Sequence, residues 1–160
     1  MIRHIASICL LAASAAAQTL TVSGDLPKPL KLTAAEFANM PRETVTIPEQ
    51  DGAKTQYEGV ALREIMKLAG APLGKVLRGK ALASYIVARA HDGYQVVFTL
   101  GEIDTDFGGA SIVVADKRDG KPLPAPQGPF RLVVANDKAG ARGVRMLDSL
   151  EFVKLKAAAP

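Results

Sequence analysis

The chain has almost no cysteine. Its single cysteine is Cys9, near the start of the 160 residues. If the segment around Cys9 is removed on export, the remaining domain can form no disulfide bond and offers no thiolate to a metal and no cysteine nucleophile. We therefore expect a domain that is held together by its hydrophobic core alone.

The segment around Cys9 has the features of a secretory signal peptide. A short basic start is followed by an apolar run from Ile5 to Ala13, and Ala15 and Ala17 give an A-x-A cleavage pattern. The run is far shorter than the roughly 20 apolar residues of a membrane-spanning helix. We therefore predict a signal peptide over residues 1–17, one mature domain over residues 18–156, and a periplasmic or secreted location.

Several other residue types are scarce. Tryptophan is absent, and aromatic residues make up 5% of the chain. The net charge is only +4, and the sequence contains no long run of like charges. A stacking platform or a basic stripe for nucleic acid is therefore not expected. After cleavage His91 is the only histidine, which excludes a site with several histidine ligands. No carboxylate pair and no Ser/His/Asp order stands out, so the sequence suggests no acid–base machinery.

Short alternating and apolar segments dominate the rest of the chain. Turn residues, capping boxes and periodicity predict strands near residues 20–23, 45–47, 54–57, 84–90, 94–98, 110–115, 130–135 and 144–153. They predict short helices after Thr33 and Thr99 and a clear helix from Leu62 to Ala69, with Gly70 as its C-terminal cap. The order shows no βαβ rhythm, which favours an α+β fold with two or three short helices.

Six blocks of residues carry a resemblance to a known family. In chain order they are Val22–Gly24, Pro29–Thr33 with Phe37, Tyr57–Leu62 running to Gly70, Ala90–Tyr94, Asp119–Leu123 with Gly128–Val134, and Val144–Leu147 with Leu150–Val153. Taken together they resemble the molybdopterin-binding domain of the sulfite oxidase family. The resemblance implies mixed sheets with a barrel-like core, and a pterin-binding pocket formed by loops at one end of the sheets.

The chain departs from this family at one position. In catalytic members the strand before the helix that begins near Leu62 carries a cysteine whose thiolate ligates molybdenum, whereas the corresponding stretch here, Val45 to Gln50, contains no sulfur. The resemblance is closer to small periplasmic proteins that bind a reduced pterin without molybdenum and pass this signal to a membrane enzyme of cyclic-dinucleotide turnover. It implies a reduced or molybdopterin-like pterin as ligand, no molybdenum, no nucleic acid and no catalysis.

The first candidate binding residues lie in one tight turn. A pterin presents an amino group, a ring N–H and a carbonyl, and a carboxylate can accept the two N–H groups as a fork. Asp92 is a candidate for this role, beside His91 and Tyr94, although an Asp-Gly pair is also an ordinary turn signal. His91 is as well explained as a surface residue.

Other candidates come from the loops that precede the last strands. The resemblance implies basic residues that face a phosphate at Arg142 and Arg145, and a glycine-flanked Arg142 would present its fork freely. Arg131 lies within an apolar strand and is assigned either to the pocket or to the sheet surface. Glu49 lies close to the missing cysteine and is a candidate for the pocket floor.

Two alternatives remain open. One is a small molybdenum-dependent oxidoreductase with a ligand other than cysteine, which the missing thiol disfavours. The other is a partner-binding domain that keeps the fold without the pocket, since a fold does not fix a function.

Overall fold

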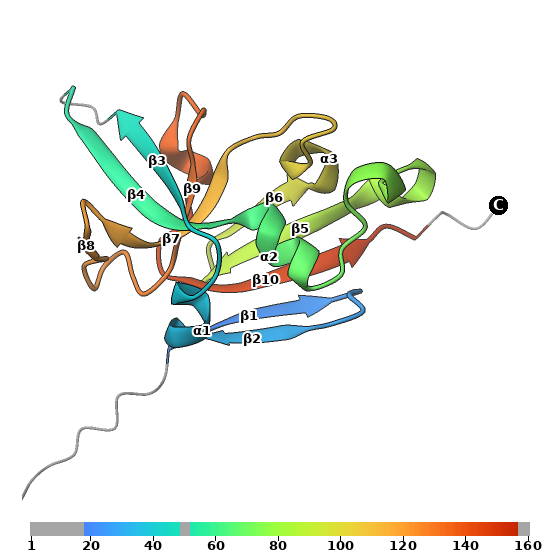
Figure 1. Cartoon of the computed structure of the whole chain (residues 1–160), viewed down its shortest axis with the longest axis horizontal. Helices are drawn as coiled ribbons and strands as arrows, with labels where there is room; N and C mark the ends of the chain where they lie inside the picture. Colours follow the sequence, from blue (N-terminus) through green and yellow to red (C-terminus); the bar gives the residue numbers. More distant parts are fainter. Residues whose placement is uncertain (1–17, 49–51, 157–160) are drawn as a thin grey trace, which may run out of the picture.

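A computed structural model describes residues 18–48 and 52–156 (Figure 1). The predicted signal peptide and Glu49 lie outside these residues. Two sheets and three short α-helices confirm the α+β class. None of the helices in the described ranges is long and apolar enough to cross a membrane.

The first sheet combines the two ends of the described chain. Its strand order is β2-β1-β10-β5-β6, and β1 pairs in parallel with β10 while its other pairs are antiparallel. The strands are β1 (Thr19–Gly24), β2 (Leu30–Thr33), β5 (Ser84–Ala90), β6 (Gln95–Thr99) and β10 (Leu147–Lys154). The sheet is therefore mixed, as the sequence predicted.

The second sheet is antiparallel and has the order β3-β4-β7-β8, with β9 also paired to β7. Its strands are β3 (Glu43–Pro48), β4 (Lys54–Ala61), β7 (Ile112–Arg118), β8 (Lys121–Pro122) and β9 (Arg131–Val134). Strand β4 is longer than predicted, because it continues through Gly59 to Ala61 before the helix begins.

The helices are α1 (Ala34–Ala38), α2 (Leu62–Leu68) and α3 (Leu100–Ile103), with 3₁₀ turns at Gly74–Val76, Gly79–Ala83 and Gly140–Arg142. Thr33 and Glu36 form the predicted capping box at α1. At α3, Thr99 accepts the Glu102 N–H as predicted. Gly70 adopts the left-handed conformation expected after α2, with φ of 83°. The local chemistry of helix ends was therefore readable from sequence.

The main core lies between the sheets and α2. Leu62, Ile65 and Met66 are fully buried, as the helical spacing predicted. Phe37 of α1 and Phe130 meet edge to face with ring centroids 4.8 Å apart. A smaller core on the second sheet surrounds Tyr57. This apolar packing is the source of stability that a domain without disulfide bonds requires.

The contact between β4 and β7 leaves no room for a side chain at Gly59. A Cβ at this position would lie 1.9 Å from the Val114 carbonyl oxygen, at the place where the register of the two strands shifts. We predict that Gly59→Ala lowers the free energy of unfolding by more than about 2 kcal/mol, because backbone must move to relieve the clash. Urea unfolding followed by circular dichroism measures this loss.

Gly101→Ala is the matched control. A Cβ at Gly101, within α3, meets no atom within 4 Å. Because alanine restricts the unfolded chain and favours helix, this substitution should raise stability by about 0.5–1 kcal/mol. Equal effects of the two substitutions would contradict the close approach at Gly59.

Candidate functional site

The turn of residues 91–94 and the segment of residues 137–148 meet at one corner of the molecule. The backbone N–H of His91 donates to the Met146 carbonyl at 2.9 Å, and the Tyr94 hydroxyl donates to the Ala141 carbonyl. We call this region the loop junction. It brings together five of the predicted site residues, His91, Asp92, Tyr94, Arg142 and Arg145.

Arg142 does not present a free fork at the loop junction, so this expectation was wrong. Its Nε and Nη2 donate to the two carboxylate oxygens of Asp137 at 2.7 and 2.6 Å, and its Nη1 donates to Glu102 at 2.5 Å. The guanidinium also lies 5.3 Å from the ring centroid of Phe98. All three nitrogens are thus engaged: the bond to Glu102 connects the 3₁₀ turn with α3, and the two bonds to Asp137 close the loop that precedes the turn.

The electrostatics of this cluster favour the charged forms. The hydrogen bonds to Asp137 and Glu102 raise the pKa of Arg142, and the bonds from Arg142 lower the pKa of the Asp137 carboxyl. Both shifts indicate that the ion pair stabilises the folded state.

The other predicted residues of the junction are exposed. Asp92 accepts the backbone N–H of Tyr94 at 3.0 Å, so its carboxylate caps its own turn. Tyr94 is 48% exposed. Arg145 is also exposed, and no hydrogen bond or ion pair joins its side chain to another described residue.

Arg131 lies on β9 in the second sheet, where it lines a small cavity of about 40 Å³ together with Asp137 and Gly143 of the loop junction. Its Nη1 donates to the Tyr57 hydroxyl at 2.7 Å and to Gln127 Oε1 at 2.8 Å, and its guanidinium lies 4.7 Å from the Tyr57 ring centroid. These contacts explain how a cation is accommodated within an apolar strand. The Tyr57 side chain is buried in the smaller core, and its hydroxyl is satisfied by Arg131.

A cavity of about 350 Å³ lies beside the loop junction. It is lined by Gln18, Thr19, His91, Gly128, Pro129, Met146, Leu147 and Asp148. His91 is the one predicted residue in its wall. The volume lies at the lower end of the range of small-molecule pockets, roughly 300–1,000 Å³.

The backbone on one side of this cavity is unusual. Met146 adopts a left-handed conformation with φ of 47°, which costs a non-glycine residue free energy. The surroundings hold it in place, because its N–H donates to the Gln127 carbonyl and its carbonyl accepts the His91 N–H. Such residues are concentrated at functional sites.

The sequence predicted a continuous strand over residues 144–153, and this was wrong at its start. Pairing with β5 begins only at Leu147, and it becomes regular at Ser149, after a register shift between these two residues. Asp148 is therefore a bulged residue, exposed while Leu147 and Leu150 are both buried. Two core leucines three residues apart cannot share one face of a regular strand. That spacing was the signal for Asp148 that sequence reasoning missed.

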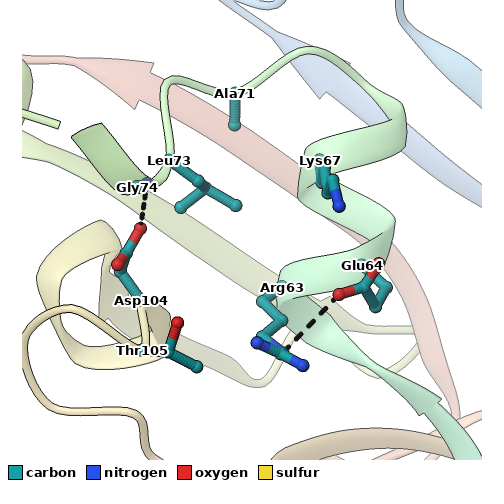
Figure 2. Close-up of a pocket in the computed structure, with 8 residues that line it drawn as sticks. All are labelled: Arg63, Glu64, Lys67, Ala71, Leu73, Gly74, Asp104 and Thr105. Atoms are coloured by element: carbon teal, nitrogen blue, oxygen red, sulfur yellow. Dashed lines mark hydrogen bonds and ion pairs between the residues drawn. The ribbon is translucent and has the colours of Figure 1, made fainter. Parts of the chain in front are cut away.

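A second cavity, of about 250 Å³, lies between α2 and the loops that follow α2 and α3 (Figure 2). Arg63 and Lys67 of α2 lie across from Asp104 and Thr105. Asp104 is 3% exposed and accepts backbone N–H groups from Gly74 at 2.5 Å and from Asp106 at 2.8 Å. Its carboxylate is thus explained by loop structure, and the cavity contains none of the predicted residues.

The described residues do not suit a metal centre of the sulfite oxidase type. They contain no cysteine. Within residues 18–48 and 52–156, no group of three or more His, Cys, Asp or Glu side chains could hold a metal ion. The thiolate on which molybdenum relies in this type of site therefore has no counterpart in the described part of the chain.

The ion pair at Arg142 predicts a pH-dependent loss in Asp137→Asn. Because the folded pKa of Asp137 is lowered, its stabilising effect is complete above the unfolded pKa of about 4 and disappears as the pH falls through the lower folded value. We expect the variant to lose about 1–2 kcal/mol at neutral pH, discounted for partial exposure. The difference from the unmodified chain should shrink below about pH 4.

Urea unfolding at several pH values between neutral and strongly acidic measures this difference. A difference in the free energy of unfolding that stays constant over the whole pH range would contradict the prediction. It would show that Arg142 does not stabilise the charged form of the Asp137 carboxyl.

Comparisons with known proteins agree with this architecture. A family model described as "Oxidoreductase molybdopterin binding domain" matches residues 10–159. The crystal structure of the sulfane dehydrogenase SoxCD from Paracoccus pantotrophus is similar, with a TM-score of 0.65 and 19% sequence identity. The similarity covers 86% of this chain and 38% of that one. No curated protein sequence matches the chain.

Proposed function

The chain belongs to the oxidoreductase molybdopterin-binding domain family, and on that premise we propose that it binds a pterin-type ligand in the 350 Å³ cavity beside the loop junction. The observation that carries the proposal is this cavity, which is large enough for a bicyclic ring. Its wall contains His91, which the sequence suggested as a binding residue, and Met146, whose backbone is left-handed.

The cavity wall suits the chemistry of a pterin ring. Pro129 and the polarisable sulfur-bearing side chain of Met146 supply apolar surface for the ring faces. His91, Thr19 and Gln18 supply hydrogen-bonding groups at the edges. Arg145, exposed and next to Met146 in sequence, could hold a polar or phosphorylated substituent at the rim.

We propose a binding role without catalysis. A molybdenum centre bound to a thiolate would supply redox chemistry, but the described residues offer no thiol for it. The same residues show no cluster of metal ligands. A pterin bound without this metal would act as a signal that changes the surface of the domain.

We further propose that the domain acts in the periplasm. The signal-peptide features of residues 1–17 support a periplasmic location. The partner would be the periplasmic domain of a membrane enzyme of cyclic-dinucleotide turnover, as the sequence resemblance implied. Co-purification of the ligand-loaded domain with such a membrane protein from the native host tests this step.

The binding role predicts that a pterin accompanies the protein. The chain should be expressed with its own leader in a bacterial periplasm and purified gently, and pterin fluorescence and metal content recorded. Pterin without molybdenum is expected. Molybdenum at one atom per chain would overturn the non-catalytic proposal, and no affinity for any added reduced pterin would overturn the binding proposal.

Two arginine variants locate the site. We expect Arg145→Ala to weaken pterin binding about threefold to tenfold, the loss of one exposed charged contact. Arg63→Ala is the matched control, because this exposed arginine lines only the cavities near α2. Isothermal titration of both variants with the same reduced pterin gives the comparison. A loss confined to Arg63→Ala would move the site to the α2 cavity.

A further inference from the structure

We infer that Asp148 is the residue that selects the ligand, by accepting two adjacent N–H groups from the aminopyrimidinone edge of the ring. This inference rests on the proposed function and narrows it to rings with a 2-amino group beside a ring N–H. Neither the sequence resemblance nor the expected turn residues pointed to Asp148.

A bulge in β10 brings Asp148 to the cavity. The register of β10 with β5 runs from Leu147 opposite Ala90 to Ser149 opposite Arg89, so Asp148 has no partner residue on β5. A bulge directs the side chain of the extra residue away from the regular alternation. Here that residue lines the cavity.

The carboxylate of Asp148 is available to a ligand. Among the described residues that line the cavity, Asp148 is the only one with a carboxylate. No hydrogen bond or ion pair joins its side chain to another described residue. The other carboxylates of the loop junction are engaged, since Asp92 caps its turn and Asp137 binds Arg142.

Hydrogen bonds hold the backbone next to Asp148 in place. The Leu147 N–H donates to the Phe130 carbonyl at 2.8 Å, and the Met146 N–H donates to the Gln127 carbonyl at 3.0 Å. The bulge is therefore tied to the segment of residues 127–130, which contributes Gly128 and Pro129 to the lining of the same cavity. A carboxylate on such a support is held ready for a ligand, which reduces the entropy lost on binding.

The chemistry of an ionised carboxylate then sets the selectivity. It accepts hydrogen bonds and donates none. A pterin presents its 2-amino group and its N3–H side by side, so both can donate to the two oxygens of Asp148 as charge-assisted bonds. Lumazine, the same bicyclic ring with a carbonyl in place of the amino group, directs an oxygen lone pair at the carboxylate and should be rejected.

The experiment compares oxidised pterin with oxidised lumazine. Both rings are fluorescent and are titrated into the purified mature domain in slightly acidic buffer, where both are neutral. We expect the unmodified domain to prefer pterin about tenfold to a hundredfold, the value of one or two charge-assisted hydrogen bonds.

The variant Asp148→Asn should lose or reverse this preference, because an amide can donate to the lumazine carbonyl and accept from its N3–H. Asp106→Asn is the matched control: it removes the same charge from an exposed loop residue that does not line the cavity. It should keep the preference for pterin. Circular dichroism and urea unfolding establish that each variant is folded.

Each outcome is decisive. If neither ring binds to the unmodified domain, with reduced pterins also tested, the proposed function is overturned. If both rings bind the unmodified domain equally well, pterin binding stands and the role of Asp148 is overturned. This second test requires no variant. A preference for pterin that survives in Asp148→Asn would likewise assign the selection to another residue.

Discussion

The position of β10 is the constraint on which the rest of the structure depends. This strand lies between β1 and β5 at the centre of the first sheet (Figure 1). Its apolar side chains must face the core along its whole length, although Leu147 and Leu150 are out of step for a regular strand. The bulge at Asp148 resolves this conflict. One packing requirement thus determines which polar side chain stands beside the cavity.

The loop junction shows how stability and binding are divided among charged residues. Arg142 donates hydrogen bonds to Asp137 and Glu102, and the bond to Glu102 holds the 3₁₀ turn against α3. Arg145, only three positions further, remains exposed. Two arginines in one loop therefore have different surroundings: the guanidinium of Arg142 is bonded to two carboxylates, and that of Arg145 faces solvent.

Much of the fold could be predicted because its signals are local. The capping residue Thr33, the left-handed Gly70 and the apolar face of α2 depend on neighbours a few positions away, and each was found where expected. The site depended on long-range pairing. The spacing of residues did not reveal that Asp137 and Glu102 would bind Arg142. It also did not reveal the left-handed backbone of Met146. The leucine spacing around Asp148 was the single local sign of the bulge.

The pairing of β1 with β10 has a consequence for how the chain folds. These are the first and the last strands of the described chain, and they lie side by side in parallel. The first sheet therefore lacks its central strand until the C-terminal segment is available. Contacts between residues so distant in sequence require closure of a long loop before they contribute to stability. We therefore expect this domain to fold slowly for its size. The first sheet can be completed only when the C-terminal strand β10 is free to pair with β1 and β5.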